Sequence, residues 1–209
     1  MILAIDTAFG PIGVALLSPA GDVVAHEVVP DALGAQAEKL PPLVERMFAA
    51  AGLRPAAVTR IAVTTGPGAF TGVRVGLAFA KGLALALKVP LLGFTTLECL
   101  AAQAQAARPG VSCAAVIDAR RSEYYAHGIG AFGPAVMSAD DVRVGLDRMK
   151  RPLVVVGSGA RMIEVREVDV LDVVTVDARE LARLALRAEP SSHPAVPCYL
   201  RAPDARLPS

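Results

Sequence analysis

Residues 2–8 read Ile2-Leu3-Ala4-Ile5-Asp6-Thr7-Ala8, and residues 114–120 read Ala114-Ala115-Val116-Ile117-Asp118-Ala119-Arg120. Each stretch is an apolar run, typical of a buried strand, that leads into an aspartate and a short polar turn. A second candidate strand follows each one, at 14–17 and at 123–129. The repeat is compatible with a duplicated α/β unit, and equally with two unrelated hairpins that look alike.

The segments around the first stretch predict three strands followed by alternating helices and strands. The third strand is expected at 23–29. The first helix is expected at about 38–51, where Pro41 and Pro42 predict a late start or a kink. The rest of this half is predicted as a strand at 60–65, a Gly-Pro-Gly turn, a helix at about 71–88, a strand at 90–93, and a helix that begins with the capping box Thr95-Thr96-Leu97-Glu98.

Arg108-Pro109-Gly110 is the predicted junction between an N-terminal lobe, 1–109, and a C-terminal lobe, 110–209. The segment 190–209 is rich in proline and is expected to lie on the body as an extended tail. Between them, the second lobe is predicted to contain a helix at 139–149, a strand at 153–156, a Gly157-Ser158-Gly159 turn, a strand near 173–176 and a helix at about 178–187.

The overall composition favours a folded protein without a strong electrostatic field. Of the 209 residues 54% are hydrophobic, and 21 Lys and Arg against 20 Asp and Glu leave a formal net charge of +1. Any contact with RNA would therefore have to be local or made through a partner. The most apolar stretch, 73–92, contains Arg74, Lys81, Lys88 and Pro90, which argues against a membrane span. No signal segment precedes the first strand, so we expect a cytoplasmic protein.

Asp6, Thr7 and Asp118 are the residues that we expect to face a nucleotide or phosphate, if the chain binds one. An aspartate at the end of a strand can hold a hydrated magnesium ion or accept a proton near a phosphate. The alternative is that each carboxylate only hydrogen-bonds its own turn. Both interpretations stay open for Asp6, whereas the neighbouring Arg120 and Arg121 favour the second one for Asp118.

The most distinctive segment is Thr64-Thr65-Gly66-Pro67-Gly68-Ala69-Phe70-Thr71-Gly72-Val73-Arg74. Its glycine spacing fits neither the P-loop nor the dinucleotide-binding motif. It predicts a rigid turn from strand to helix, with Thr71 as the N-cap and free backbone N–H groups that could bind an anion.

The helix that follows carries two rows of small residues, at 72, 76, 80 and 84 and at 78, 82 and 86. A glycine inside a helix costs about 1 kcal/mol relative to alanine. Gly76 and Gly82 therefore indicate close packing, against the same lobe or against a partner. The sequence alone favours the same lobe.

The sequence contains no recognisable metal-binding or catalytic motif. His26, His127 and His193 form no HxxxH pair, the three cysteines are far apart, and no GxSxG motif occurs. We therefore predict no catalytic residues, no metal site and no tightly held cofactor. Weak binding of ATP or ADP with magnesium at a partner interface is the one cofactor interaction left open.

Together with Tyr199-Leu200-Arg201-Ala202-Pro203 in the tail, the Gly-Pro-Gly-x-Phe-Thr-Gly-x-Arg run and the two strand-Asp turns resemble the TsaB (YeaZ) family. The resemblance implies an α/β protein with the actin-like ATPase (ASKHA) fold, in two lobes of βββαβαβα type. It also implies a non-catalytic scaffold or activating subunit in the complex that makes tRNA N6-threonylcarbamoyladenosine (t6A). Its partners would be a TsaD-like catalytic subunit and a TsaE-like ATPase, and tRNA would be reached through the complex.

The resemblance further implies that the helices at about 38–51 and 71–88 pair with the equivalent helices of a partner, or of a second copy when the chain is alone. Two departures from the family's usual residues lie on this face: Thr64-Thr65 stands where an Arg is usual, and Gln36-Ala37 where a His is usual. The residues expected in the interface are Glu38, Leu40, Val44, Met47, Phe70, Thr71, Gly72, Arg74, Val75, Gly76 and Ala80.

Two other functional classes remain open at this point. A free-standing actin-like ATPase or kinase would have to bind a nucleotide with its metal between Asp6 and Asp118. A glycoprotease-like peptidase is the third class, and the scattered histidines argue against it.

Overall fold

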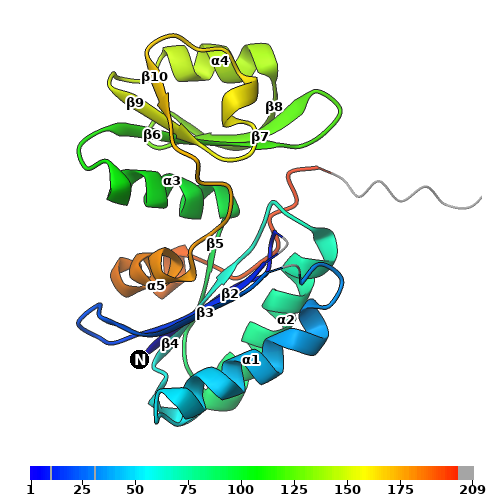
Figure 1. Ribbon diagram of the computed structural model, residues 1–209, viewed down its shortest axis with the longest axis vertical. Helices are drawn as coiled ribbons and strands as arrows, with labels where there is room; N and C mark the ends of the chain where they lie inside the picture. The colour runs from blue at the N-terminus through cyan, green and yellow to red at the C-terminus, as the bar shows by residue number, and fades with distance from the viewer. Residues whose placement is uncertain (10, 31, 202–209) are drawn as a thin grey trace, which may run out of the picture.

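The computed structural model describes residues 1–9, 11–30 and 32–201, which form stacked layers of helices and sheets (Figure 1). The helices α1 (Gln36–Ala50) and α2 (Phe70–Leu87) lie at one end, against the first sheet. The helices α3 (Thr96–Ala107) and α5 (Ala178–Arg187) lie between the first sheet and the second. The helix α4 (Ala139–Asp147) covers the far side of the second sheet.

The first sheet has five strands in the order β3-β2-β1-β4-β5. Its central strand, β1, is buried along its whole length because helices cover both faces of the sheet, which explains its continuous apolar run. It pairs antiparallel with β2 and parallel with β4. The strands are β1 (Ile2–Asp6), β2 (Ile12–Leu17), β3 (Val23–Val29), β4 (Arg60–Thr64) and β5 (Leu91–Phe94).

The second sheet repeats the topology of the first, in the order β10-β9-β6-β7-β8. Its central strand β6 pairs antiparallel with β7 and parallel with β9, so that β6 occupies the position of β1. This equivalence supports a duplicated unit over a chance likeness of two hairpins. The strands are β6 (Ser112–Asp118), β7 (Glu123–Gly128), β8 (Phe132–Ser138), β9 (Leu153–Val156) and β10 (Val168–Val170).

The last helix of each half packs on the sheet of the other half. α3 follows β5 in the chain but packs on β6, β7 and β9, whereas α5 packs on β1, β2 and β4. Leu97 and Leu100 of α3 and Leu181 of α5 therefore share one buried core with Ile2 and Val154. The predicted junction at 108–110 falls in the loop between α3 and β6, and the two sheets are joined through this common core.

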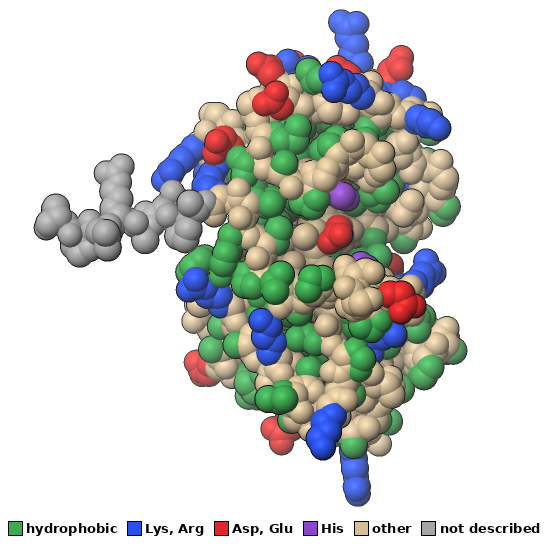
Figure 2. Space-filling view, turned by 180° about the vertical axis from the view of Figure 1, so that it is seen from behind, with side chains coloured by type: hydrophobic (Ala, Val, Ile, Leu, Met, Phe, Trp, Pro, Cys, Tyr) green, Lys and Arg blue, Asp and Glu red, His purple; other side chains and the backbone are tan. Residues whose placement is uncertain are grey.

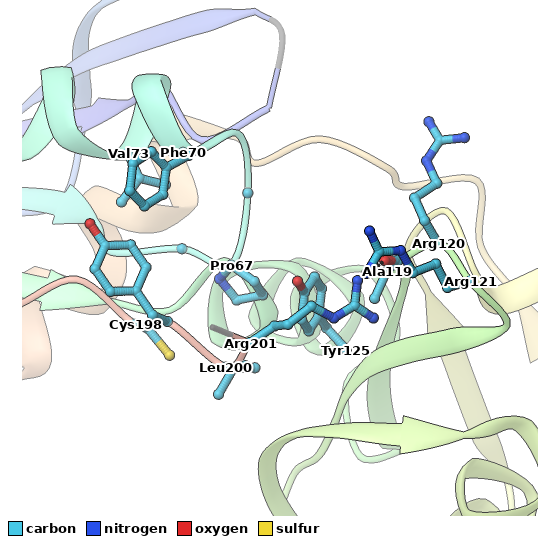
Figure 3. A pocket seen from close by; sticks show the side chains of 13 residues that line it. Pro67, Phe70, Val73, Ala119, Arg120, Arg121, Tyr125, Cys198, Leu200 and Arg201 are labelled. Atoms are coloured by element: carbon cyan, nitrogen blue, oxygen red, sulfur yellow. Dashed lines mark hydrogen bonds between the residues drawn. The ribbon is translucent and has the colours of Figure 1, made fainter. Parts of the chain in front are cut away.

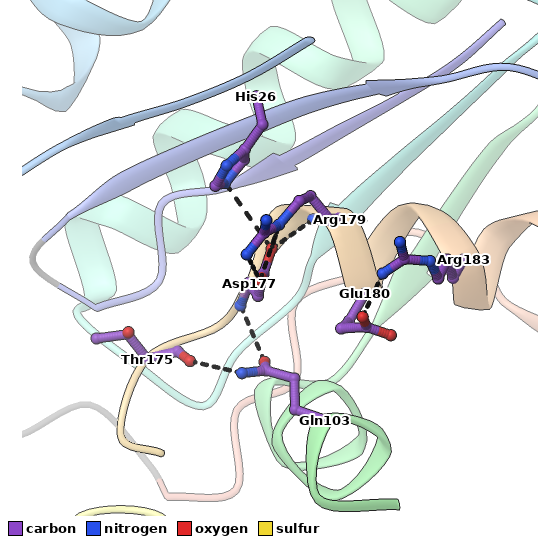
Figure 4. A network of polar contacts seen from close by, with 7 residues as sticks. All are labelled: His26, Gln103, Thr175, Asp177, Arg179, Glu180 and Arg183. Carbon is purple, nitrogen blue, oxygen red and sulfur yellow. Dashed lines mark hydrogen bonds and ion pairs between the residues drawn. The ribbon is translucent and has the colours of Figure 1, made fainter. Parts of the chain in front are cut away.

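A polar network fixes α5 in this position (Figure 4). Asp177 caps α5 by accepting a hydrogen bond from the Arg179 N–H at 2.8 Å, and its own N–H donates to Gln103 Oε1 of α3 at 2.9 Å. Its Oδ1 lies 3.8 Å from His26 Nε2 of β3. Burial lowers the pKa of His26, so near neutral pH this contact joins a neutral imidazole to a carboxylate.

Five local predictions differ from the structure. α1 begins at Gln36 with Pro41 and Pro42 inside it, so the late start is wrong. Both prolines face solvent, and the burial of the opposite helix face outweighs the hydrogen bonds that they remove. Ala69, not Thr71, is the N-cap of α2. In the second half, the strand β8 was not predicted, and β10 replaces the strand that was predicted near 173–176. A 3-10 turn (Ala160–Met162) stands where the first half has the helix α2.

The tail follows its predicted extended path over the residues that the structure describes. The Cys198 N–H donates to the Thr65 carbonyl at 2.8 Å, and the Gly93 N–H donates to the His193 carbonyl at 2.9 Å. The tail thus runs across the ends of β4 and β5 toward the space between the lobes. Residues 202–209, including Ala202 and Pro203 of the tail motif, lie outside the described residues.

Candidate functional site

Asp6 lies at the carboxyl end of β1 and is 2% exposed. Its Oδ1 accepts hydrogen bonds from Thr64 Oγ1 at 2.7 Å and from the Ala8 N–H at 3.1 Å. Burial raises the pKa of Asp6 to about 6, although these hydrogen bonds favour the charged form and oppose the rise. The geometry thus matches the interpretation in which the carboxylate organises its own turn.

Thr7 and the glycines of α2 form a very close contact between β1 and this helix. Thr7 Oγ1 donates to the Gly72 carbonyl at 2.7 Å. A Cβ atom on Gly76 would lie 2.3 Å from Thr7 Oγ1, and one on Gly72 would lie 2.1 Å from the Thr7 carbonyl oxygen. The row of small residues that includes Gly72 and Gly76 therefore packs against the chain's own strand.

This packing corrects part of the predicted partner interface. Six of its residues are buried within the first lobe, where α1 and α2 cover the sheet, and they are not available to another protein while the lobe stays folded. These residues are Leu40, Val44, Met47, Gly72, Gly76 and Ala80. The others, Glu38, Phe70, Thr71, Arg74 and Val75, reach the surface.

The outward side of α2 is apolar and largely exposed. It carries Thr71, Val75, Ala78, Gly82 and Leu85, and Leu85 is 82% exposed. With 18 residues and a mean hydropathy of 1.4, α2 is long and apolar enough to cross a membrane. The core helix of a soluble protein meets the same criterion. Over the lower lobe, Figure 2 shows hydrophobic patches between isolated Lys and Arg side chains.

A pocket of about 510 Å³ lies between the lobes (Figure 3). The turn before α2 and the first residues of that helix form one wall, and the turn between β6 and β7 forms the other. Asp6, Thr7 and Asp118 are not among its lining residues. The residues that line it are Gly66, Pro67, Gly68, Phe70, Val73, Ala119, Arg120, Arg121, Tyr125, Cys198, Tyr199, Leu200 and Arg201.

The turn between β6 and β7 has an unusual backbone. Arg120, Arg121 and Ser122 have φ angles of 65°, 57° and 59°, a region that costs a non-glycine residue on the order of 1–3 kcal/mol. Asp118 holds this turn, because its Oδ1 accepts the Arg120 N–H at 2.8 Å. The Asp118 N–H in turn donates to Ser158 Oγ at 3.1 Å. Asp118 thus serves its own turn, as the sequence favoured.

The tail connects the two walls of the pocket. On the second lobe, Arg201 donates to the Ala119 carbonyl at 2.8 Å and forms an ion pair with Glu123. On the first lobe, the Tyr199 hydroxyl accepts a hydrogen bond from Arg74 Nε at 2.9 Å.

The sequence does not predict that one pocket is lined by Arg120, Arg121, Tyr199 and Arg201. These residues come from segments about 80 positions apart, and only the return of the tail brings them together. Neither a periodicity nor a motif spacing in the sequence predicts that these two segments lie close together. Among residues 1–9, 11–30 and 32–201, no group of three His, Cys, Asp or Glu side chains is placed to hold a metal ion.

Comparison with known proteins places the chain in a family. Residues 28–162 match the family model described as "TsaD: tRNA N6-adenosine threonylcarbamoyltransferase". The tRNA threonylcarbamoyladenosine biosynthesis protein TsaB of Escherichia coli is 34% identical over 168 residues, which cover 76% of this chain and 71% of that protein.

Solved structures agree with this assignment. YeaZ from Pseudomonas aeruginosa is similar with a TM-score of 0.73 and 29% identity, over 95% of this chain and 99% of that one. The activator of 2-hydroxyisocaproyl-CoA dehydratase from Clostridium difficile, solved with bound ADPNP, has a TM-score of 0.54 at 12% identity, over 88% of this chain and 94% of that one, and supports the fold alone. The expected α/β architecture of the actin-like ATPase type is confirmed. The chain belongs to the TsaB (YeaZ) family.

Proposed function

We propose that the chain is a non-catalytic, activating subunit in tRNA threonylcarbamoyladenosine biosynthesis, and that it binds a TsaD-like catalytic subunit. The names of its TsaB relatives support the pathway. The match of residues 28–162 to a TsaD family model supports a paired arrangement, because two related lobes can present equivalent helices to each other.

The observation that carries the proposal is the outward side of α2. An isolated exposed leucine is ordinary, but Ala78, Gly82 and Leu85 are all exposed on one helix side, and the partly buried Val75 lies beside them. Ala78 and Gly82 have small side chains, and a Cβ on Gly82 would meet nothing within 4 Å. A partner helix can therefore approach α2 closely along this side, and Leu85 would be buried on contact.

An actin-like ATPase needs carboxylates that can hold magnesium. The positions of the two candidate aspartates in this chain do not favour an enzyme that acts on its own. Asp6 is buried and hydrogen-bonded within its lobe, and Asp118 holds the β6–β7 turn. Neither lines the pocket between the lobes, so the site does not fit a magnesium nucleotide held by two facing aspartates. The free-standing ATPase or kinase therefore has less support than the partner subunit.

When no TsaD-like protein is present, two copies of the chain would pair through the outward side of α2 in an isologous contact. In the cytoplasmic complex a TsaE-like ATPase would join the two subunits, and the chain would hold no cofactor tightly.

Replacement of Leu85 by glutamate tests the docking surface. Because Leu85 is 82% exposed, Leu85→Glu should leave the melting temperature of the isolated chain almost unchanged. The glutamate carboxylate would be buried without a partner charge in the complex. Co-elution with the TsaD-like protein on size exclusion should therefore be lost.

Val144→Glu is the matched control, since Val144 is 48% exposed on α4 at the opposite end of the molecule (Figure 1). It should leave the complex intact. A folded Leu85→Glu variant that still co-elutes would reject the outward side of α2 as the docking surface.

A further inference from the structure

We infer that the pocket between the lobes binds a single-stranded segment of RNA, so that this chain contacts the RNA directly. The inference rests on the proposed role in tRNA modification. It adds a binding surface distinct from the outward side of α2.

The cationic wall of the pocket is suited to phosphodiester groups. Arg120, Arg121 and Arg201 line it, and the lining residues within the described part of the chain include no Asp or Glu. Arg201 is already paired with Glu123. Within the described part of the chain, the Arg120 guanidinium makes no hydrogen bond or ion pair. The residue is exposed, and Figure 3 shows its side chain extending away from the turn. It is thus available to an anion from solution.

The opposite wall offers exposed aromatic rings. Phe70 is 41% exposed and Tyr199 is 46% exposed, with their ring centroids 5.4 Å apart. The Arg74 guanidinium carbon lies 3.5 Å from the centroid of Phe70. Unstacked bases bind against such exposed rings and guanidinium planes, and neighbouring arginines contact the backbone.

The cationic wall is built in advance of any ligand. The positive φ angles at Arg120, Arg121 and Ser122 persist because Asp118 accepts the Arg120 N–H and Arg201 donates to the Ala119 carbonyl. Residues held in such conformations cluster at functional sites. Asp118 is a positioning residue in this account, since it acts through the backbone of the turn.

RNA fits these walls better than a free magnesium nucleotide. Among residues 1–9, 11–30 and 32–201, those that line the pocket include no lysine, no serine or threonine hydroxyl and no carboxylate, which are the groups that clamp a triphosphate and its metal. A phosphodiester carries a single charge per nucleotide and needs no metal. Exposed rings beside arginines add the stacking surface that an acidic peptide would not use.

Arg120→Asn in the full chain tests the cationic wall. Asparagine tolerates a positive φ angle, so the turn should keep its shape. Ser122→Asn is the matched control, because Ser122 has a similar φ of 59° in the same turn and is not among the pocket's lining residues. The measurement is the fluorescence anisotropy of a labelled, unstructured oligoribonucleotide of about 10 nucleotides, a length within the site sizes of single-strand binders.

The expected result is a dissociation constant at least about 10-fold higher for Arg120→Asn and unchanged for Ser122→Asn. The slope of log affinity against log salt concentration should fall by about 0.7 for the lost phosphate contact. Tyr199→Ala should weaken binding, whereas Tyr199→Phe, which keeps the ring but loses the hydrogen bond from Arg74, should retain most of it.

Several results would overturn the inference. One is an absence of RNA binding by the wild-type chain, both alone and in complex with the TsaD-like protein. Another is equal RNA affinity of Arg120→Asn and wild type. Polyglutamate binding as tightly as RNA, or magnesium-ATP displacing RNA with the same dependence on Arg120, would assign the pocket to a different anion.

The outcome is separable from that of the proposed docking surface. Arg120→Asn should still co-elute with the TsaD-like protein, because Arg120 lies on the turn between β6 and β7 and not on the outward side of α2. Leu85→Glu in isolation should keep its RNA affinity, because Leu85 is not among the pocket's lining residues.

Discussion

At the scale of single residues, Asp6 shows how an aspartate that could face a phosphate, judged from the sequence, can hydrogen-bond within its own lobe. The sequence places an aspartate after an apolar strand, and this pattern is shared by phosphate-binding turns and by self-satisfied Asx turns. The difference lies in Thr64, which is 58 positions away in the chain and donates to Asp6 across the β1–β4 pair. Such a donor cannot be identified from the residues next to Asp6.

The raised pKa of Asp6 predicts a pH dependence of stability. Between its ordinary value of 3.8 and the folded value of about 6, the folded chain binds more protons at this group than the unfolded chain does. Stability from this group is therefore fully present below about pH 4 and is lost as the pH rises through 6, by on the order of 3 kcal/mol in total.

Asp6→Asn removes this titration, and its Oδ1 can still accept from Thr64 and from the Ala8 N–H. Urea unfolding of both proteins at about pH 4.5 and pH 7.5 measures the effect. The free energy of unfolding should fall between these pH values by more in the wild type than in the variant. An identical fall in the two proteins would show that Asp6 does not titrate in this range.

At the scale of elements, the two rows of small residues on α2 have opposite environments. Their spacing predicts two helix sides that allow close approach, but both rows look alike in the sequence. The structure turns Gly72 and Gly76 toward Thr7 and leaves Ala78 and Gly82 exposed. The direction is set by the burial of Val73 and Leu77 against the sheet, which turns the opposite side outward.

Alanine at Gly76 and at Gly82 should therefore change stability in opposite directions. Gly82→Ala should stabilise the isolated chain by about 1 kcal/mol through helix propensity, since its Cβ meets no atom within 4 Å. Gly76→Ala should destabilise it by about 1–3 kcal/mol, because Thr7 Oγ1 must move and lose its bond to Gly72.

Thr7→Ala supplies the test of mechanism. Combined with Gly76→Ala it should cost less than the sum of the two single changes, because the clashing hydroxyl is absent. Chemical denaturation of the four proteins gives the coupling free energy. Additive effects, or a stabilising Gly76→Ala, would place the glycine in a different environment from the one described.

The elements that the sequence predicted well are those with strong local signals. The capping box at Thr95 and Glu98 forms as expected and opens α3, and Ser138 caps α4. β8 was missed because Gly133 and Pro134 indicate a turn, yet a proline is compatible with a strand at the edge of a sheet, where β8 lies. The strand was predicted near 173–176 and not at 168–170 because both segments are short and rich in valine. Only the pairing with β9 selects 168–170 as β10.

At the scale of the whole molecule, the sequence is compatible with two related halves but does not indicate the exchange of their last helices. α3 and α5 have ordinary amphipathic patterns, which record that one side is buried but not against which sheet. Their exchange gives both sheets one core, with Leu97, Leu181 and Val154 in a single cluster. It also brings the tail back across the cleft, which creates the pocket between Phe70 and Arg120.

We propose that this molecule activates a catalytic partner through the outward side of α2 and performs no transfer itself. The direct measurement is nucleoside analysis of tRNA after a reconstituted reaction that contains the TsaD-like and TsaE-like proteins. Adding the wild-type chain or Val144→Glu should yield threonylcarbamoyladenosine over many turnovers. Leu85→Glu, or omission of the chain, should lower the yield at least about 10-fold, as expected when a buried contact is lost. Undiminished product without the chain or with Leu85→Glu, or product from the chain alone, would contradict the account.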